Sequence, residues 1–302
     1  MLQLHHRFIQ TAKQHSGRMA VHDKATDKDY SYGRMLIASL ILKEHVGKIK
    51  GRYIGILLPT SMGCMLGILS TLMNGKIPVM INYSTGAIDH CLYAREKCSF
   101  KTILTSRKLL EKLNLAPIDH MIFVEDILAK VTIVSKLKAA ALSKLPFPLL
   151  KNMVHSGPLE EISVILFTSG SEKEPKAVQL SHRNILHNID AIPQLVTLDH
   201  NDVFISMLPL FHVFGLTTNF WLPALLGATM VTYPNPLEYK TISELVRQYK
   251  VTFMTATPTF FYGYLQKSQP GDFTSIRLAI AGADKLPDKV YEGFLKKHTK
   301  RM

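Results

Sequence analysis

The feature that most constrains the fold is a regular alternation of short apolar runs with longer segments of helical spacing. The runs have the length and composition of buried strands, and we place them at residues 53–59, 76–82, 101–106, 120–126, 163–169, 202–209, 228–234, 251–258 and 276–283. The intervening segments predict helices at 62–75, 87–99, 107–115, 181–195, 214–226, 241–250 and 259–268. Strands separated by helices in this way predict an α/β fold with parallel sheets covered by helices on both faces. In such sheets, ligands bind at the carboxyl ends of the strands.

One uncharged stretch, Ile54 to Met73, is long enough to span a bilayer. However, Pro59, Thr60 and Ser61 divide it into a strand-like part and a helix-like part. Asn74 and Gly75 follow as a typical helix end. We therefore expect a strand, a turn and a helix in place of a membrane span.

The chain has 302 residues, 47% of them hydrophobic, which is enough for a large core. We expect an N-terminal α/β subdomain over residues 1–150 and a second one over 156–302. The three cysteines, Cys64, Cys91 and Cys98, form no CxxC pair, and the N-terminus has no secretory h-region. These features favour a reducing compartment, and we expect a cytoplasmic protein.

The chain is basic, with 36 Lys and Arg against 23 Asp and Glu. No acid lies between Asp126 and Glu160, whereas five lysines stand there among apolar residues: Lys130, Lys136, Lys138, Lys144 and Lys151. One interpretation is a basic amphipathic patch, over 130–151, that touches anionic lipid at the inner face of a membrane. The other is a solvated basic linker near 127–155 between the two subdomains. No nucleic-acid-binding motif accompanies the charge, so nucleic acid is not an expected partner.

The segment "LFTSGSEKEPK" ends a predicted strand in small and hydroxyl residues, followed by a lysine. Backbone N–H groups, hydroxyls and a mobile cation suit the binding of a phosphate. The residues concerned are Thr168, Ser169, Gly170, Ser171 and Lys176. The spacing is neither that of a P-loop nor that of a nucleophile elbow. A surface turn rich in Ser and Gly is the alternative.

Several segments together resemble the adenylate-forming enzymes, the superfamily of acyl and aryl synthetases. The resemblance covers about residues 19–294 and is carried by "DYSYGRM", "FTSGSEKEPKAVQLSH", "LPLFHVFGLTTNFWLPALLGATMV", "ATPTFFYGYLQ" and "LAIAGADKLP". Within the superfamily, "GKIPVMINYSTG", "YPNPLEYKTISELV" and "AGADKL" are similar to the synthetase half of the acyl-acyl-carrier-protein synthetase/2-acylglycerophosphoethanolamine acyltransferase family.

The resemblance implies ATP-dependent activation of a fatty acid to an acyl-adenylate, with Mg²⁺, and transfer to acyl carrier protein or a lysophospholipid. It implies that the loop residues hold the β- and γ-phosphates and that His212 lies near the reacting carboxylate. It places Gly282, Ala283 and Asp284 at the adenine, and residues 214–221 along an acyl pocket. Without the resemblance to the family, the sequence would predict that His212 is a buried histidine of the core.

The chain also departs from the family's pattern. Lys173 and Ala177 stand where relatives usually have glycine. The Tyr-Gly-x-Thr-Glu block that helps to hold Mg²⁺, the Thr-Gly-Asp block and the C-terminal lid domain with its catalytic lysine are not found. We therefore expect an incomplete N-terminal domain of the adenylate-forming fold with little turnover. The alternatives are a non-catalytic acyl- or nucleotide-binding protein and a basic protein that binds lipid surfaces.

A second motif is set aside. "HDKATD", His22 to Asp27, has the His-x4-Asp spacing of glycerolipid acyltransferases. So short a match occurs often by chance, and its context predicts a polar turn between two short strands.

Overall fold

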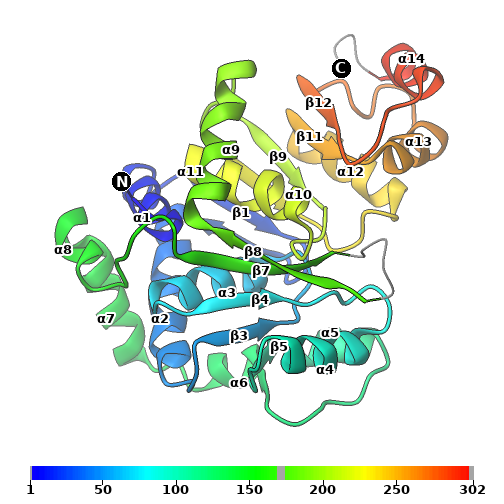
Figure 1. The fold of residues 1–302 in the computed structure, drawn as a ribbon. Coiled ribbons are helices and arrows are strands. Elements are labelled where there is room, and N and C mark those ends of the chain that lie inside the picture. Colours follow the sequence, from blue (N-terminus) through cyan, green and yellow to red (C-terminus); the bar gives the residue numbers. More distant parts are fainter. Residues whose placement is uncertain (1, 169–173, 299–302) are drawn as a thin grey trace.

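The structure, a computed structural model, describes residues 2–168 and 174–298. The strands of this part form two six-stranded sheets (Figure 1). The first sheet has the order β12 (Leu278–Ala281), β11 (Phe253–Ala256), β9 (Val203–Ser206), β10 (Thr229–Thr232), β1 (Met19–Asp23), β2 (Lys28–Ser31). The second has the order β6 (Met121–Phe123), β5 (Ile103–Thr105), β3 (Tyr53–Ile56), β4 (Ile77–Met80), β7 (Ile162–Thr168), β8 (Lys176–Ser181).

Neighbouring strands are parallel except in two edge hairpins, β1–β2 and β7–β8. Helices flank both sheets: α1 (Leu4–Gln14), α2 (Tyr32–Gly47), α3 (Met62–Met73), α4 (Ala87–Lys97), α5 (Arg107–Lys112), α6 (Val124–Ala129), α7 (Ile133–Lys144), α8 (Phe147–Lys151), α9 (His182–Leu195), α10 (Val213–Leu216), α11 (Leu222–Leu226), α12 (Tyr239–Tyr249), α13 (Pro258–Lys267) and α14 (Asp288–Lys297). The predicted α/β class with parallel sheets is therefore confirmed.

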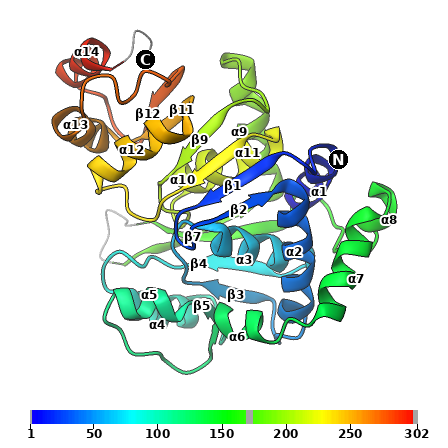
Figure 2. The same cartoon turned by 180° about the vertical axis from the view of Figure 1, so that it is seen from behind.

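A layer of two helices separates the sheets (Figure 2). α2 and α3 pack on each other; α2 contacts β1 and β2, while α3 contacts β3 and β4. Both helices are rich in buried apolar residues because each has a sheet or a helix on most of its surface. The described residues form two hydrophobic cores, and this layer belongs to the larger one.

The uncharged stretch from Ile54 folds as expected, into β3, a turn and α3. The side chain of Ser61 caps α3 by accepting from the backbone N–H of Cys64 at 3.3 Å. Gly75, with φ +67°, ends the helical segment in the left-handed conformation that glycine adopts without strain. Among residues 2–168 and 174–298, no helix is long and apolar enough to cross a membrane.

Sheet membership does not follow the predicted division near residue 150. β1 and β2 belong to the first sheet through β10, whereas β7 and β8 belong to the second through β4. The two halves of the chain therefore exchange strands. The 1–150 and 156–302 subdomains stay a prediction.

The side chain of Asp23 links the first sheet to the start of helix α3. It is 1% exposed and lies at the end of β1. Its Oδ1 accepts from the hydroxyl of Thr232, in β10, at 2.8 Å and from the backbone N–H of Met62, at the start of α3, at 3.0 Å. Asp23 also explains the polar turn after it, because its Oδ2 accepts from Thr26 at 2.6 Å. His22 bonds to Asp29 in the opposite strand at 2.7 Å, in keeping with a turn between two strands.

The basic segment predicted as a linker is largely helical. It contains the end of α6, then α7 and α8, and α7 packs against α2. The segment is therefore a fixed part of the surface.

Candidate functional site

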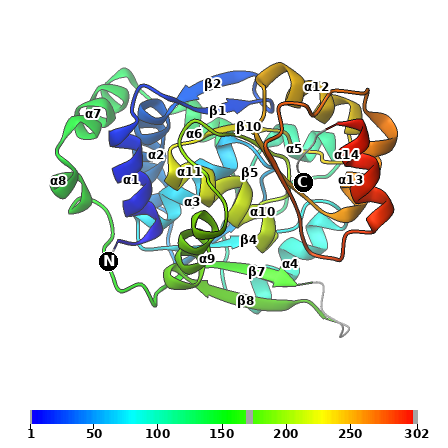
Figure 3. The ribbon, with the colours of Figure 1, turned by 90° about the horizontal axis from the view of Figure 1, so that it is seen from above.

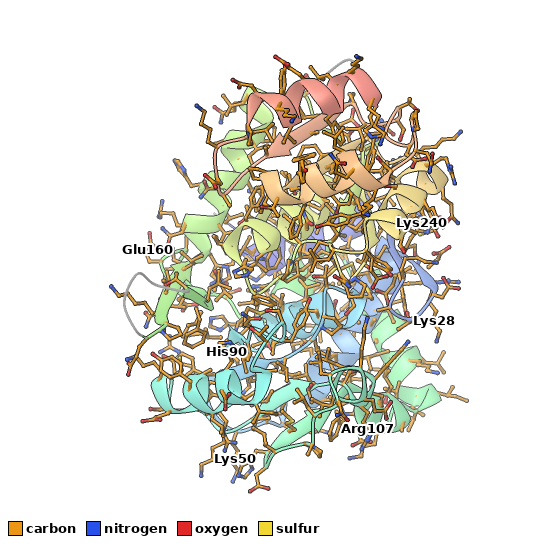
Figure 4. All side chains as sticks on the ribbon, turned by 90° about the vertical axis from the view of Figure 1, so that its right-hand side faces the viewer. Lys28, Lys50, His90, Arg107, Glu160 and Lys240 are labelled. Atoms are coloured by element: carbon orange, nitrogen blue, oxygen red, sulfur yellow. The ribbon has the colours of Figure 1, made fainter. Side chains whose placement is uncertain are left out.

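The predicted site residues follow three strands at one side of the molecule. Thr168 ends β7, His212 follows β9, and Gly282 follows β12. Figure 3 shows the tip of the β7–β8 hairpin on the same side as α12, α13 and α14. Figure 4 faces this side and shows Lys240, of α12, in its upper half and His90, of α4, in its lower half. The predicted residues thus lie at carboxyl ends of strands, where the general rule for such sheets places a ligand.

Two residues of the predicted phosphate loop stand at the paired ends of β7 and β8. Thr168 and Lys176 are partners across the hairpin, and both are exposed. Lys176 is the first residue of β8, a strand that we did not predict. Ser169, Gly170 and Ser171 lie outside the described residues, as does Lys173.

The hairpin is fixed to α4 by one tyrosine. Tyr93 donates its hydroxyl to the backbone oxygen of Pro175 at 2.7 Å. Its ring packs edge-on against Phe167, with centroids 5.9 Å apart. Tyr93 therefore contacts the chain just before the loop, at Phe167, and just after it, at Pro175.

His212 is exposed and stands at the N-terminal end of α10, so it is not a core histidine. Its ring lies 4.5 Å from that of Phe211, and partial burial lowers the pKa of the imidazole below its usual value. Phe211 in turn packs edge-on against Tyr83, which follows β4, with centroids 5.0 Å apart. The turn before α10 thus joins the first sheet to the second.

The buried side-chain amide of Asn219 holds the strand end that leads into the same turn. Asn219 accepts the backbone N–H groups of Met207 and Leu208 on its Oδ1, both at 2.9 Å. Its Nδ2 donates to the hydroxyl of Thr255 at 2.7 Å and to that of Thr218 at 3.1 Å. Every polar atom of the Asn219 side chain is therefore used. The amide fixes the chain that leads to His212.

The segment predicted as a helix over 214–226 contains a π-helical turn, η1 (Thr217–Trp221), between α10 and α11. Asn219 is its central residue. π-helical turns inside helices are frequent at functional sites. Three residues proposed for the acyl pocket, Leu216, Phe220 and Trp221, instead fill the core, and each is at most 1% exposed. Burial follows from their apolar side chains on the inner face of the segment.

The predicted adenine residues lie next to this segment. The backbone N–H of Gly282 bonds to the backbone oxygen of Ala256 at 3.1 Å, which continues the pairing of β12 with β11. Any Cβ at Gly282 would lie 2.6 Å from Cζ of Phe214. Ala283 has φ +71°, an uncommon conformation for alanine, and Asp284 is exposed. The structure therefore brings Gly282 against Phe214, two residues after His212.

Sequence reasoning missed Tyr93, Asn219 and Thr255. A polar amide within a largely apolar helical segment is the signal that could have pointed to Asn219, because buried amides need several partners. Nothing in the sequence singled out Tyr93.

The exposed hydroxyl of Thr168 and the ammonium of Lys176 are suited to the phosphates of a nucleotide. Groups of three or more His, Cys, Asp or Glu side chains placed for a metal are absent from residues 2–168 and 174–298. Mg²⁺ needs no such group where one or two carboxylates and the phosphates of a substrate hold it.

The family model for AMP-binding enzymes matches residues 8–302. Among curated relatives, the medium-chain fatty-acid–CoA ligase of Escherichia coli (strain K12) is 33% identical over 43% of this chain and 23% of its own length. The long-chain-fatty-acid–CoA ligase of Bacillus subtilis (strain 168) is 30% identical over 46% and 25%. The 4-coumarate–CoA ligase 1 of Narcissus pseudonarcissus is 25% identical over 93% and 52%.

Solved structures agree on the fold. The N-terminal domain of FACL13 from Mycobacterium tuberculosis matches with a TM-score of 0.79 at 19% identity, covering 98% of this chain and 74% of that one. The o-succinylbenzoate–CoA synthetase of Bacillus subtilis, solved with its acyl-adenylate, matches with a TM-score of 0.77 at 18% identity, covering 96% and 71%.

These matches confirm the fold of the N-terminal part of adenylate-forming enzymes. The matched regions span between 23% and 52% of the length of the three curated relatives. With a family model that matches residues 8–302, the chain belongs to the AMP-binding enzyme family.

Proposed function

We propose that the chain activates a fatty acid with ATP. The observation that carries the proposal is its identity of 33% and 30% to relatives named as medium-chain and long-chain fatty-acid–CoA ligases. In the proposed reaction, a carboxylate oxygen of the fatty acid attacks the α-phosphorus of ATP. The bond from that phosphorus to the bridging oxygen breaks, and pyrophosphate leaves with the bonding electrons. The product is an acyl-adenylate.

The β7–β8 hairpin would hold the phosphates. We assign the β- and γ-phosphates to Thr168, Ser169, Gly170, Ser171 and Lys176. The exposure of Thr168 and Lys176 at paired positions of the two strands supports this role, because it leaves a hydroxyl and an ammonium side by side at the surface. Donors and positive charge there would stabilise the pyrophosphate as it leaves.

The opposite wall would hold the carboxylate and the adenine. We assign His212 to the reacting carboxylate, and its exposure at the start of α10 supports that position. We assign Gly282, Ala283 and Asp284 to the adenine. All three residues follow β12, and Gly282 lies against Phe214, two residues after His212, which supports a wall shared by both groups. Mg²⁺ would accompany the ATP, bound mainly through its phosphates.

The acyl group would then pass to a thiol or a lysophospholipid. The similarity in sequence supports the phosphopantetheine of acyl carrier protein, whereas the names of the relatives support coenzyme A. The thiolate would attack the acyl carbon and release AMP. A contact of residues 130–151 with a membrane would involve a different face of the protein.

Two measurements on the 302-residue chain test the proposal. The first is calorimetric titration with ATP and Mg²⁺, on the chain and on Lys176→Ala. Loss of a charged hydrogen bond to phosphate should weaken binding about tenfold to a hundredfold. The matched control is Lys50→Ala, because Lys50 is exposed before β3, at the other end of the strands.

The second measurement is ATP–pyrophosphate exchange with and without fatty acids. Exchange that requires a fatty acid supports adenylate formation. Binding of ATP without any exchange contradicts it and leaves the nucleotide-binding alternative. Failure to bind ATP contradicts both.

A further inference from the structure

We propose that the outer face of α7 is a docking surface for an anionic lipid bilayer. The surface comprises α7 with the end of α6 and the helix α8. The inference does not rest on the proposed function.

The orientation of α7 is the first observation. Ala139 faces inward and is buried, and the helix packs on α2. The large apolar residues point outward instead: Ile133 and Val134 are 74% exposed and Leu137 is 66% exposed. Ile133 and Leu137 are four residues apart and share one stripe of the helix. A helix that buries alanine and exposes isoleucine, valine and leucine leaves a largely apolar face open to its surroundings.

The charges around this stripe are the second observation. At 3.6 residues per turn, Lys136 and Lys138 fall on either side of the stripe, and Lys144 lies at its far end. Lys138 pairs with Glu44 of α2 at 2.5 Å. No acid occurs between Asp126 and Glu160, so the segment itself supplies no negative charge. An apolar stripe flanked by lysines is the pattern of helices that lie in the interface of an anionic membrane.

A groove beside the helix is the third observation. It measures about 870 Å³ and runs between α2 and α7. Its apolar lining includes Ile37 and Ile41 on one side and Leu137 on the other. Its charged lining is net positive, with Lys28, Arg34 and Lys136 against one carboxylate, Asp29. Apolar walls beside cations match a lipid with an acyl chain and an anionic headgroup.

The charges on α7 also favour a bilayer over a second copy of the chain as the occupant of this surface. In a symmetric dimer, the lysines of one α7 would face those of the other, and like charges oppose such a contact. A bilayer with anionic lipid presents apolar and negative groups together. Figures 1 and 3 place α7 and α8 on the side of the molecule away from the β7–β8 tip. Docking would therefore leave the candidate site clear of the membrane.

The experiment is cosedimentation of the 302-residue chain with vesicles. One set contains phosphatidylcholine with 30% phosphatidylglycerol, and the other contains phosphatidylcholine alone. We expect binding to the first set, weaker binding at 0.5 M salt, and little binding to the second. Leu137→Glu should reduce the affinity more than tenfold, because it puts a carboxylate where an apolar side chain enters the lipid.

Two further variants keep the test decisive. Lys136→Gln with Lys144→Gln should reduce affinity about fivefold per lysine. Leu195→Glu is the matched control: Leu195 is 84% exposed, on α9, and outside this surface. Unchanged circular dichroism of the exposed-site variants verifies folding.

Three results would overturn the proposal. One is failure of the parent chain to bind the anionic vesicles. The second is an equal loss of binding in Leu195→Glu and Leu137→Glu. The third is a dimer in solution that Leu137→Glu converts to a monomer, because the face would then be a contact between copies.

Discussion

The ring of Phe214 occupies the space that a side chain at position 282 would need. A Cβ on Gly282 would lie 2.6 Å from Cζ of Phe214, well inside van der Waals contact. The contact joins the turn after β9 to the end of β12, and so joins the proposed carboxylate and adenine regions. A side chain at 282 would thus need the ring of Phe214 or the end of β12 to shift.

Gly282→Ala should therefore force Phe214 or the end of β12 to move. We expect a loss of about 1–3 kcal/mol in the free energy of unfolding, as for other overpacked positions. Urea denaturation measures it. Adding Phe214→Leu removes the ring atoms that clash and should recover much of the loss. An alanine variant as stable as the parent chain would show that the backbone yields easily, and would count against this packing argument.

Asn219→Ala should destabilise the fold by about 2–4 kcal/mol. The change leaves the buried N–H groups of Met207 and Leu208 without acceptors, and each such group costs about 1–3 kcal/mol. The control is Asn188→Ala, since the amide of Asn188 is exposed and bonds only within α9 to Asn184. Equal midpoints of urea unfolding for the two variants would contradict a special role of Asn219.

Asp23→Ala tests the link between the first sheet and helix α3. It removes the acceptor of Met62, Thr232 and Thr26, three groups from different parts of the fold. We expect a loss of about 3 kcal/mol in the free energy of unfolding, because a buried hydrogen-bonded network is broken. Asp29→Ala, at the exposed partner of His22, should cost under about 1 kcal/mol. A comparable loss in both variants, measured by thermal or urea unfolding, would argue against the buried link.

The sequence was sufficient for most of the strands and for the helical segments between them. It did not predict α1, α2, α6, α7, α8 or α14, nor the distribution of the strands between the sheets. Strand and helix signals are local: the turn at 59–61 and the cap at Ser61 separate β3 from α3 without any knowledge of the rest. The pairing of β1 with β10 joins residues about two hundred positions apart. The choice of β10 as the neighbour of β1 depends on how the whole chain packs. β8 was missed because its short, half-exposed run resembles the end of a loop.

The sequence predicted which strand ends carry the candidate site. It did not predict the tertiary contacts that hold those strand ends in place. Thr168, His212 and Gly282 follow strands that the sequence placed. The contact between Gly282 and Phe214 and the bonds from Asn219 depend on how β9, β11 and β12 lie side by side. These contacts come from tertiary geometry, to which no local pattern points.

The pH dependence of stability should arise mainly at a histidine cluster far from the candidate site. Burial lowers the pKa of His182 and of His6 to about 4, and burial beside His6 takes that of His5 well below its usual value. The backbone N–H of Leu4, at the start of α1, donates to Nδ1 of His182 at 3.2 Å. Protonation of that nitrogen would remove the acceptor and leave a charge in the interior.

The sign follows from linkage. The folded-state pKa values lie below the unfolded value of about 6.5, so the unfolded chain binds more protons as pH falls between about 6.5 and 4. The stability contributed by the neutral rings is present above about pH 6.5 and is lost toward pH 4. Each such histidine lowers the free energy of unfolding by up to roughly 1.4 kcal/mol per pH unit in this window.

Urea unfolding at pH 7.5, 6.0 and 5.0 measures this slope for the parent chain and for His182→Gln. Glutamine keeps an oxygen to accept the N–H of Leu4 but does not titrate, so the slope should become shallower by about one histidine's share. His187→Gln, on the exposed face of the same helix α9, is the matched control. If both variants flatten the profile equally, or neither does, the buried cluster is not the source of the acid sensitivity.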